Sequence, residues 1–273
     1  MKKRPKKQKK MTLKEAIEIL KSAGVESADY DARELFKLYC SPPVMLSTEC
    51  DKAELISALE RRAKREPLQY IIGSVGFYRE EYIVTHDCLI PRSDTEILVD
   101  YAVKNLPSGA GFADLCTGSG CIAISVLKNT DRTTALAVDI SEGALYVARK
   151  NAELNGVSDR IAFRQADLLK ERIDGSFFAV LSNPPYVTDG AYLRLEDEIY
   201  HEPRAAFVGG EDGGDFYRTL TPIYKDMIAE GGFIAYEIGY DQAELLLKIA
   251  EDCGMSCEIL KDFSGNDRVA VLR

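Results

Sequence analysis

The sequence predicts an α/β protein whose larger part is a doubly wound, mostly parallel sheet of seven strands, preceded by a small all-helical domain and a β-hairpin connector. Three observations support this fold class. Strand-like and helix-like runs alternate after Pro91. The segment "ADLCTGSGCIA" places glycines where a strand turns into a helix. The last two strand-like runs are joined by the short "DFSGND", which favours an antiparallel pair at one sheet edge.

The N-terminal region has the pattern of helices. Thr12 and Glu15 form a capping-box pattern at the start of an amphipathic run that ends at Gly24, and similar runs cover about 27–40 and 52–65. The apolar "YIIG" and the alternating "GFYREEYIVT" then indicate a β-rich hairpin. We therefore expect a basic disordered tail over 1–10, a helical domain over 11–68, a hairpin linker over 69–90 and the α/β domain over 91–273.

The elements of the α/β domain follow in order along the chain. Alternating apolar residues indicate strands, and apolar residues three or four apart indicate helices. Strands are predicted at 111–116, 134–140, 161–167, 177–183, 232–239, 256–261 and 268–272, and helices at 93–105, from 120, at 142–154, 214–229 and 241–252.

The net charge of −9 hides an asymmetry. Seven of the 35 lysines and arginines lie in the first ten residues, so the rest of the chain carries 28 basic against 44 acidic side chains, a net charge of −16. Such an acidic body disfavours stable nucleic-acid binding. The apolar runs are too short to span a membrane, and the basic N-terminus lacks the apolar segment of a secretory signal. A cytoplasmic protein is expected.

The cysteines give no sign of a metal site or a disulfide framework. The seven cysteines include no C-x-x-C pair, and the two histidines are His86 and His201. We expect reduced thiols and no bound metal. Cys116 and Cys121, beside the glycine motif, are interpreted as small packing residues rather than as nucleophiles.

The glycine motif has the pattern of a ligand-binding turn. Gly118 and Gly120 lie where a ligand approaches the backbone closely and where helix N–H groups point outward. Extended to Ala123, the motif also fits a G-x-G-x-x-A fingerprint. By itself it does not separate nicotinamide cofactors from S-adenosylmethionine, or either from a purely structural turn.

Two carboxylates end the next two strands. Asp139 follows the glycine motif at the ~20-residue spacing from which a carboxylate accepts hydrogen bonds from a ribose diol. Asp167, one strand further out, is expected to read an adenine edge. Each also fits as the cap of a following helix. Asp114, just before the motif, either orients the loop or meets a cofactor amino group.

The segment "VLSNPPYV" ends the fourth strand with two prolines, which lack an N–H donor and restrict the residue before them. Asn183 is therefore held rigidly. Its side-chain carbonyl and the Pro184 backbone carbonyl are two hydrogen-bond acceptors held in one geometry, and Tyr186 adds an aromatic ring. A strand-terminating turn without chemistry is the alternative.

Together these residues resemble a known family. "DLCTGSG", Asp139 and "NPPY" are similar to the class I S-adenosylmethionine-dependent methyltransferases that act on planar nitrogens. The resemblance covers about 11–273 and narrows to the protein-(glutamine-N5) methyltransferases that modify peptide chain release factors. The segments that narrow it are "PLQYIIG" (67–73), "LIPRSDTEILV" (89–99), "HEPRAAFVGGEDGGDFYR" (201–218) and "FIAYEIGYDQ" (233–242).

The resemblance implies a Rossmann-like methyltransferase sheet, a monomer, S-adenosylmethionine as cofactor, and S-adenosylhomocysteine as product. The implied substrate is the glutamine of the Gly-Gly-Gln motif of a release factor, methylated at N5 and recognised with the help of the helical domain. The implied catalytic residues are Asn183, Pro184, Pro185 and Tyr186. The implied cofactor-binding residues are Asp114, Cys116, Thr117, Gly118, Ser119, Gly120, Asp139, Asp167, Leu168 and Asn183.

The departures from the family pattern are few. Cys116 stands where a glycine is common, and Ser93 where a proline is common. Leu168 stands where relatives often have tryptophan, so adenine stacking there is weaker or falls to another side chain. Glu202, Asp212 and Arg218 either line the substrate cleft or form a solvated charged face, and the second interpretation is favoured.

Other functions stay open at this point. A nucleic-acid amine methyltransferase uses the same Asn-Pro-Pro-aromatic arrangement on a flipped base, but the acidic body disfavours it. A glutamine methyltransferase acting on a ribosomal protein is disfavoured by "PLQYIIG" and by the helical domain. A nicotinamide-binding or non-catalytic Rossmann domain leaves the Asn183–Tyr186 segment unexplained.

Overall fold

The computed structural model describes residues 10–40 and 43–273, which divide into two compact units. The first contains the chain up to Gly73 together with Glu196–His201, and the second contains Ser74–Leu195 and Glu202–Arg273. The predicted basic tail over 1–10 lies, apart from Lys10, outside the described residues. Within the described ranges no helix is both long enough and apolar enough to cross a membrane.

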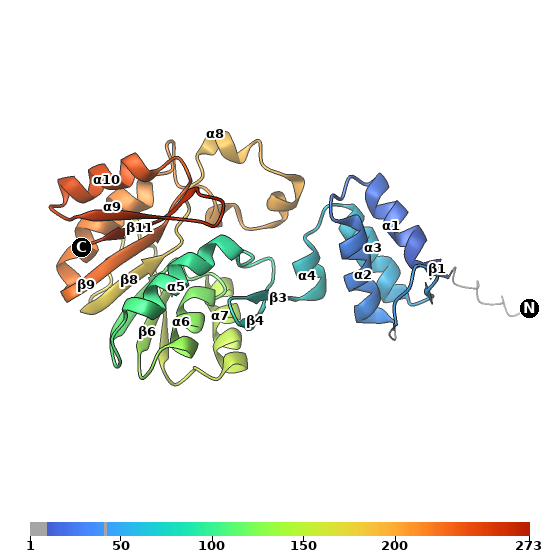
Figure 1. Ribbon diagram of the computed structural model, residues 1–273, viewed down its shortest axis with the longest axis horizontal. Helices are drawn as coiled ribbons and strands as arrows, with labels where there is room; N and C mark the ends of the chain where they lie inside the picture. Colours follow the sequence, from blue (N-terminus) through green and yellow to red (C-terminus); the bar gives the residue numbers. More distant parts are fainter. Residues whose placement is uncertain (1–9, 41–42) are drawn as a thin grey trace, which may run out of the picture. The chain divides into compact units, whose positions relative to one another are not determined.

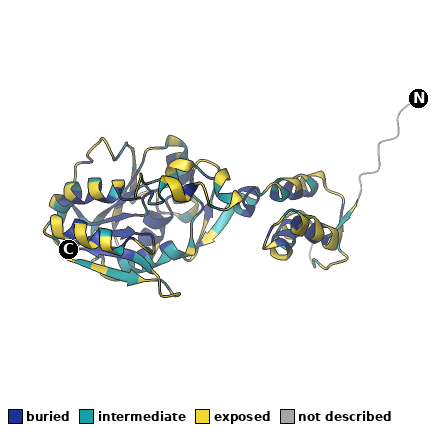
Figure 2. Cartoon of the chain, turned by 90° about the horizontal axis from the view of Figure 1, so that it is seen from above, coloured by how far each residue is buried: buried dark blue, intermediate teal, exposed yellow. Residues whose placement is uncertain are grey.

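Amphipathic helices build the first unit (Figure 1). Helix α1 (Leu13–Ser22) begins with the predicted capping box: the Glu15 N–H donates to Thr12 Oγ1 at 3.2 Å, and the Glu15 carboxylate accepts from the Thr12 N–H at 2.8 Å. Helices α2 (Ala28–Tyr39) and α3 (Ala53–Ala63) follow. Their apolar faces form one core, seen in Figure 2 as buried inner faces beneath exposed outer faces.

The first unit also contains β structure, although the sequence predicted an all-helical domain. Two short strands, β1 (Met11–Thr12) and β2 (Glu49–Cys50), pair in antiparallel fashion. The β-rich prediction for "YIIG" is also wrong, because Leu68–Ile72 form helix α4. Pro67 precedes this helix and Gly73 ends it at φ 89°, so the apolar run between them packs into the helical core. The hairpin starts later, as β3 (Ser74–Phe77) and β4 (Glu80–Ile83).

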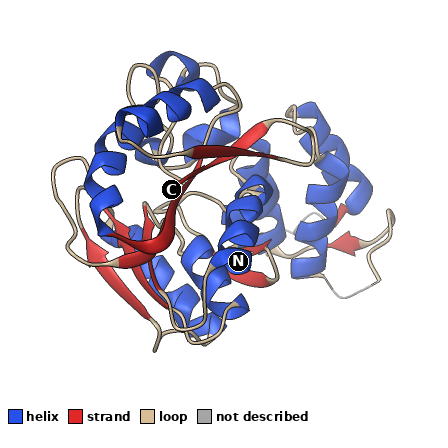
Figure 3. Cartoon of the chain, turned by 60° about the vertical axis from the view of Figure 1, so that its left-hand side comes forward, coloured by secondary structure: helices blue, strands red, loops and turns tan. Residues whose placement is uncertain are grey.

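The second unit contains the predicted seven-stranded sheet, whose strands are drawn in red in Figure 3. The strand order is β10-β11-β9-β8-β5-β6-β7. Its strands are β5 (Gly111–Leu115), β6 (Thr134–Asp139), β7 (Ile161–Gln165), β8 (Phe177–Ser182), β9 (Ile228–Glu237), β10 (Cys257–Lys261) and β11 (Asp267–Leu272). The neighbouring strands β7, β6, β5, β8 and β9 all run parallel to one another. Strand β11 is antiparallel to both β9 and β10. This confirms the antiparallel pair predicted from "DFSGND".

Helices cover both faces of the sheet. Helices α5 (Glu96–Asn105), α6 (Cys121–Asn129) and α7 (Glu142–Asn155) share one apolar core with the hairpin. Helices α9 (Asp215–Tyr224) and α10 (Ala243–Asp252) share the other. With both faces covered, the carboxyl ends of the strands are where a doubly wound sheet binds ligands.

Two stretches differ from the predicted elements. The helix predicted at 214–229 ends at Tyr224, close after Pro222, which has no N–H to donate to the preceding turn. A 3₁₀ turn at Lys225–Met227 then leads into β9, which starts at Ile228, earlier than predicted. The helix predicted at 93–105 begins as a 3₁₀ turn at Ser93–Thr95 before α5. The short helix α8 (Asp189–Tyr192) and the 3₁₀ turns at Asp197–His201 and Arg204–Ala206 were not predicted.

Candidate active site

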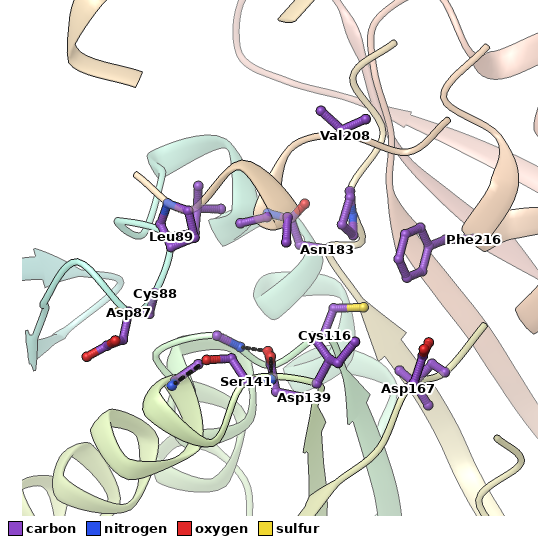
Figure 4. A pocket seen from close by; sticks show the side chains of 18 of the residues that line it. Asp87, Cys88, Leu89, Cys116, Asp139, Ser141, Asp167, Asn183, Val208 and Phe216 are labelled. Atoms are coloured by element: carbon purple, nitrogen blue, oxygen red, sulfur yellow. Dashed lines mark hydrogen bonds between the residues drawn. The ribbon is translucent and has the colours of Figure 1, made fainter. Parts of the chain in front are cut away.

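A cavity of about 320 Å³ opens where strands β5, β6, β7 and β8 end. Figure 4 shows Asn183 on one side of this cavity and Asp139 with Ser141 on the other. The sequence-predicted residues that line the cavity are Cys116, Gly118, Asp139, Asp167, Leu168, Asn183 and Pro185. The predicted residues that do not line it are Asp114, Thr117, Ser119, Gly120, Pro184 and Tyr186.

The glycine motif forms a tight turn between β5 and α6. The Thr117 N–H donates to the Val138 carbonyl at 2.9 Å, and the Gly120 N–H donates to the Thr117 carbonyl at 2.8 Å. Gly120 has φ 82°, and a Cβ there would lie 2.9 Å from Ile124 Cδ1, so this glycine also permits close packing. A Cβ on Gly118 would meet nothing within 4 Å, so the backbone there borders open space.

Asp114 lies fully buried behind this turn. Its Oδ2 accepts from Thr117 Oγ1 at 2.5 Å and from the Ala123 N–H at 3.1 Å, so it orients the loop, one of its two predicted roles. Its Oδ1 has no hydrogen-bond partner among the described residues. Burial raises the pKa of Asp114 to about 7, against the two hydrogen bonds that lower it. The free oxygen therefore suits a cationic partner.

Asp139 accepts hydrogen bonds from two backbone segments that line the cavity, one at Gly118 and one at Ser141. Its Oδ2 accepts from the Gly118 N–H and its Oδ1 from the Ser141 N–H, each at 2.9 Å. Burial raises its pKa, while these hydrogen bonds lower it. The cap of α7 is Ser141, whose side chain accepts from the Ala144 N–H. The helix-cap interpretation of Asp139 is therefore wrong.

Asp167 lies at the cavity and also caps the turn that follows it, and its predicted role as a reader of adenine stays a prediction. It lines the cavity, and its Oδ1 accepts from the Leu169 N–H at 3.2 Å, as a local cap does. The segment it caps is a turn and not the helix start suggested by "DLLKE". A hydrogen bond from Lys170 lowers the pKa of Asp167. Leu168 is 4% exposed and faces the same cavity.

Asn183 follows β8 and points its side chain at the cavity (Figure 4). Its Nδ2 donates to Thr95 Oγ1 at 3.2 Å, and no described residue donates a hydrogen bond to its Oδ1. The hydroxyl of Tyr186, a residue that does not line the cavity, donates to Glu237 Oε1 at 3.2 Å. Asn183 thus offers one amide oxygen to a ligand.

Several cavity residues were missed by sequence reasoning. Leu89, Pro203, Ala205, Ala206, Val208 and Phe216 lie in the segments 89–99 and 201–218 that carry the family resemblance, but nothing in those segments singled them out as cavity residues. The others are mostly apolar or come from turns, and no motif marks them. The missed residues are Asp87, Cys88, Leu89, Ile140, Ser141, Ala144, Ala166, Leu169, Pro203, Ala205, Ala206, Val208 and Phe216.

The solvated-face interpretation is wrong for Glu202. This residue is 5% exposed, accepts from the Ile90 N–H at 2.9 Å and pairs with Arg92. Asp212 and Arg218 do form an exposed ion pair, and Arg218 lowers the pKa of Asp212 to about 2. Neither of these two lines the cavity.

The thiols beside the site are poor nucleophiles. Burial raises the pKa of Cys116 and of Cys121, which disfavours the reactive thiolate form. Within residues 10–40 and 43–273, no three His, Cys, Asp or Glu side chains come together to hold a metal ion.

Comparison with known proteins places this geometry in a family. Residues 12–73 match the PrmC N-terminal domain, and residues 93–211 match the methyltransferase small domain. Among solved structures, the catalytic domain of hMettl16 superposes with a TM-score of 0.58 at 12% identity, covering 89% of this chain and 91% of that one. A ribosomal protein L11 methylase from Lactobacillus delbrueckii gives 0.51 at 22% identity, covering 67% and 80%. At these identities the two structures show a shared fold.

Curated relatives are more informative. A release factor glutamine methyltransferase from Geobacter sulfurreducens is 39% identical over 211 residues, which cover 77% of this chain and 74% of the relative. One from Caulobacter vibrioides is 37% identical over 265 residues, which cover 92% and 91%. With these identities and coverages, the chain belongs to the release factor glutamine methyltransferase family.

Proposed function

We propose that this protein transfers the methyl group of S-adenosylmethionine to the side-chain amide nitrogen, N5, of the glutamine in the Gly-Gly-Gln motif of peptide chain release factors. The proposal rests on the position of the Asn183 side chain and on its free amide oxygen. Its Oδ1 is free of donors from the described residues, and it lies across the cavity from Asp139 in a chain of this family.

The residues around the cavity fit the cofactor. S-adenosylmethionine supplies an electrophilic methyl group on a sulfonium centre. Asp114 does not line the cavity, and it supports the cofactor site from behind by orienting the glycine turn through its bonds to Thr117 and Ala123. Each oxygen of Asp139 accepts one backbone N–H and keeps a lone pair for a ribose hydroxyl. Open space beside Gly118 lets the ligand approach the backbone.

The adenine ring requires an apolar slot. Leu168 and Phe216 line the cavity and offer such a surface, and Phe216 supplies an aromatic ring where Leu168 cannot stack. Asp167 at the same wall keeps a lowered pKa and so stays an acceptor for an exocyclic amine.

The substrate amide needs positioning more than a base. The nitrogen of a glutamine amide is a weak nucleophile because its lone pair is delocalised into the carbonyl. Acceptance of its two N–H groups by Asn183 Oδ1 and by the Pro184 carbonyl aims the lone pair and meets the positive charge that develops on nitrogen. The prolines fix the backbone between these acceptors, and Pro185 lines the cavity. Tyr186 does not line the cavity, so packing of its ring against the amide has no support here, and its part is to anchor the segment through its bond to Glu237.

The helical unit, which matches the PrmC N-terminal domain, is proposed to recognise the release factor. The Caulobacter vibrioides relative aligns over 92% of this chain, so the alignment includes both the helical region and the methyltransferase region. A protein substrate gives such an extra domain a purpose that a free nucleobase does not.

A labelled-transfer assay tests the proposal. Purified protein and S-adenosylmethionine labelled in its methyl group are incubated separately with a bacterial release factor, duplex and single-stranded DNA, RNA and ribosomal proteins. We expect label on the release factor alone. Label on nucleic acid or on a ribosomal protein, with an unlabelled release factor, would contradict the proposed substrate.

A further inference from the structure

A chain of buried hydrogen bonds lies behind Asn183 and has no part in the roles described so far. Asn183 Nδ2 donates to Thr95 Oγ1 at 3.2 Å, and Thr95 Oγ1 donates to Glu237 Oε2 at 2.5 Å. The other carboxylate oxygen of Glu237, Oε1, accepts from the Tyr186 hydroxyl at 3.2 Å. Thr95 and Glu237 are each 2% exposed. One buried carboxylate is therefore connected to both the first and the last residue of the Asn183–Tyr186 segment.

The direction of these bonds follows from counting donors. An ionised carboxylate only accepts, so the hydrogen between Thr95 and Glu237 belongs to Thr95. Because a hydroxyl has one hydrogen, the Thr95 oxygen then presents only lone pairs to Asn183. The side-chain NH₂ of Asn183 can pair with these lone pairs, whereas its carbonyl oxygen would face another acceptor. The reversed amide would lose a buried hydrogen bond, which costs about 1–3 kcal/mol.

We propose that Thr95 and Glu237 are positioning residues for methyl transfer, which fix the Asn183 amide in the orientation that presents Oδ1 to the substrate nitrogen. This inference rests on the proposed function, because it assigns Oδ1 the task of accepting a substrate N–H. With the amide reversed, Asn183 would direct its own NH₂ at the NH₂ of the substrate, and two donors do not pair.

The rest of the segment is held from the same side. Gln242 Nε2 donates to the Tyr186 carbonyl at 3.0 Å, and Gln242 Oε1 accepts from the Gly239 N–H at 2.9 Å. The strand end at Glu237 and the turn after it therefore support both the side chains and the backbone of the segment. Because these bonds hold the backbone of the segment, we expect a change at Thr95 to affect mainly the rotation of the Asn183 side-chain amide.

The test compares three variants in steady-state methylation of a release factor. Thr95→Val keeps the shape of the side chain but removes the hydroxyl. We expect its kcat to fall roughly 10- to 100-fold, as misplacement of a positioned group does, with the calorimetric Kd for S-adenosylmethionine unchanged. Thr95→Ser keeps the hydroxyl and should recover most of the lost kcat.

Thr133→Val is the matched control. Thr133 is fully buried just before β6, and its hydroxyl bonds to that of Thr130 at 2.5 Å, so this change also removes a buried hydroxyl but at the other end of the sheet. Its kcat should equal that of the unchanged protein. A loss of kcat as large as that of Thr95→Val would show a general effect of lost stability and overturn the proposal.

The outcomes separate the two proposals. The unchanged protein is assayed first. If it transfers no methyl group to a release factor, the proposed function itself is contradicted. If transfer occurs, full kcat in Thr95→Val overturns the positioning role, as does a Thr95→Ser protein that recovers nothing. If Thr95→Val does not fold, Glu237→Gln decides. This variant should bind the cofactor normally with a reduced kcat, and full kcat overturns the proposal.

Discussion

Asp139 is the single residue on which cofactor binding should depend most directly, because its two oxygens hold the backbone at Gly118 and Ser141 and also face the cavity. Asp139→Ala removes hydrogen bonds to a charged acceptor, each of which contributes about 1.5–3 kcal/mol, so the Kd for S-adenosylmethionine should rise roughly 10- to 100-fold. Isothermal titration calorimetry measures it. Asp174→Ala, at an exposed acidic residue, should leave the Kd unchanged. An unchanged Kd in Asp139→Ala would remove Asp139 from the cofactor site.

Glu237 gives the reaction a pH dependence. Burial raises its pKa to about 7; the hydroxyls of Thr95 and Tyr186 and the positive charge of Arg268 act to lower it, and the negative charge of Asp94 adds to the rise. Below that pH the carboxyl gains a proton and becomes a donor, so Thr95 no longer has to donate to it. Because the deprotonated form is the active one, kcat should fall as the pH decreases through about 7.

Glu237→Gln tests the origin of this fall. Glutamine cannot ionise, so the variant should have a lower kcat without the inflection near pH 7. The measurement uses saturating cofactor, because Asp114, which orients the glycine turn beside the cavity, also has a pKa of about 7. If the inflection persists unchanged in Glu237→Gln, another group causes it.

At this scale the sequence predicted the residues of contiguous motifs and missed their distant partners. Asn183 and Asp139 were found because strand ends and glycine turns have local patterns. Thr95 and Glu237 were not found, because Thr95 lies 88 residues from Asn183 and 142 residues from Glu237 along the chain. A hydrogen bond between side chains so far apart leaves no periodicity in the sequence.

At the scale of elements, the loop after Phe207 supports the Asn183–Tyr186 segment by direct backbone contact. The Val187 N–H donates to the Phe207 carbonyl at 2.8 Å, and the Gly209 N–H donates to the Val187 carbonyl at 2.9 Å. A Cβ on Gly209 would lie 2.3 Å from the Pro185 carbonyl oxygen, a contact that side-chain movement cannot relieve. Only glycine allows this close approach.

Gly209→Ala should therefore displace the segment and lower kcat by about 100-fold or more, the cost of misplacing a catalytic group by about 1 Å. Gly190→Ala is the control, because a Cβ on Gly190 meets nothing within 4 Å. Methylation kinetics of the two proteins decide the matter. Equal kcat values would mean that the loop does not position the segment.

The elements themselves were largely predictable, with instructive exceptions. The seven strands and their antiparallel pair follow from alternating apolar residues and from a short connection. The short apolar run at 70–72 predicts β structure but has no period of its own, and packing against the other helices makes Leu68–Ile72 a helix. The apolar period continues beyond Pro222 and therefore predicts too long a helix at α9. Pro222 has no N–H to donate to the preceding turn, and the helix ends at Tyr224.

At the scale of the whole molecule, the segment Glu196–His201 groups with the helical unit although it comes after the active-site segment in sequence. Arg62 explains this grouping. Its guanidinium bonds to Asp31 Oδ2 at 2.6 Å and to Glu198 Oε1 at 3.0 Å, and its side chain is 6% exposed. Arg65 adds a second bond to Glu198 at 2.7 Å. No sequence pattern predicts this, since Arg62 and Glu198 are 136 residues apart.

Arg62→Ala should destabilise the helical unit strongly, because it leaves the buried carboxylate of Asp31 without its cationic partner. Removing one partner of a buried pair costs about 3–5 kcal/mol. Urea unfolding followed by circular dichroism measures the change in the free energy of unfolding. Arg33→Ala removes the exposed Arg33–Asp29 pair and should change little. Equal stability of the two variants would contradict a structural role for Arg62.

In the proposed reaction, Asn183 presents a glutamine amide of a release factor for methylation. Mass spectrometry of the proteolysed release factor after reaction tests this role. We expect one added methyl group on the glutamine of the Gly-Gly-Gln peptide with the unchanged protein, and none with Asn183→Ala, although that variant still binds S-adenosylmethionine. Methylation of that glutamine by Asn183→Ala at the rate of the unchanged protein, or a methyl group on any other residue, would show that Asn183 does not have this role.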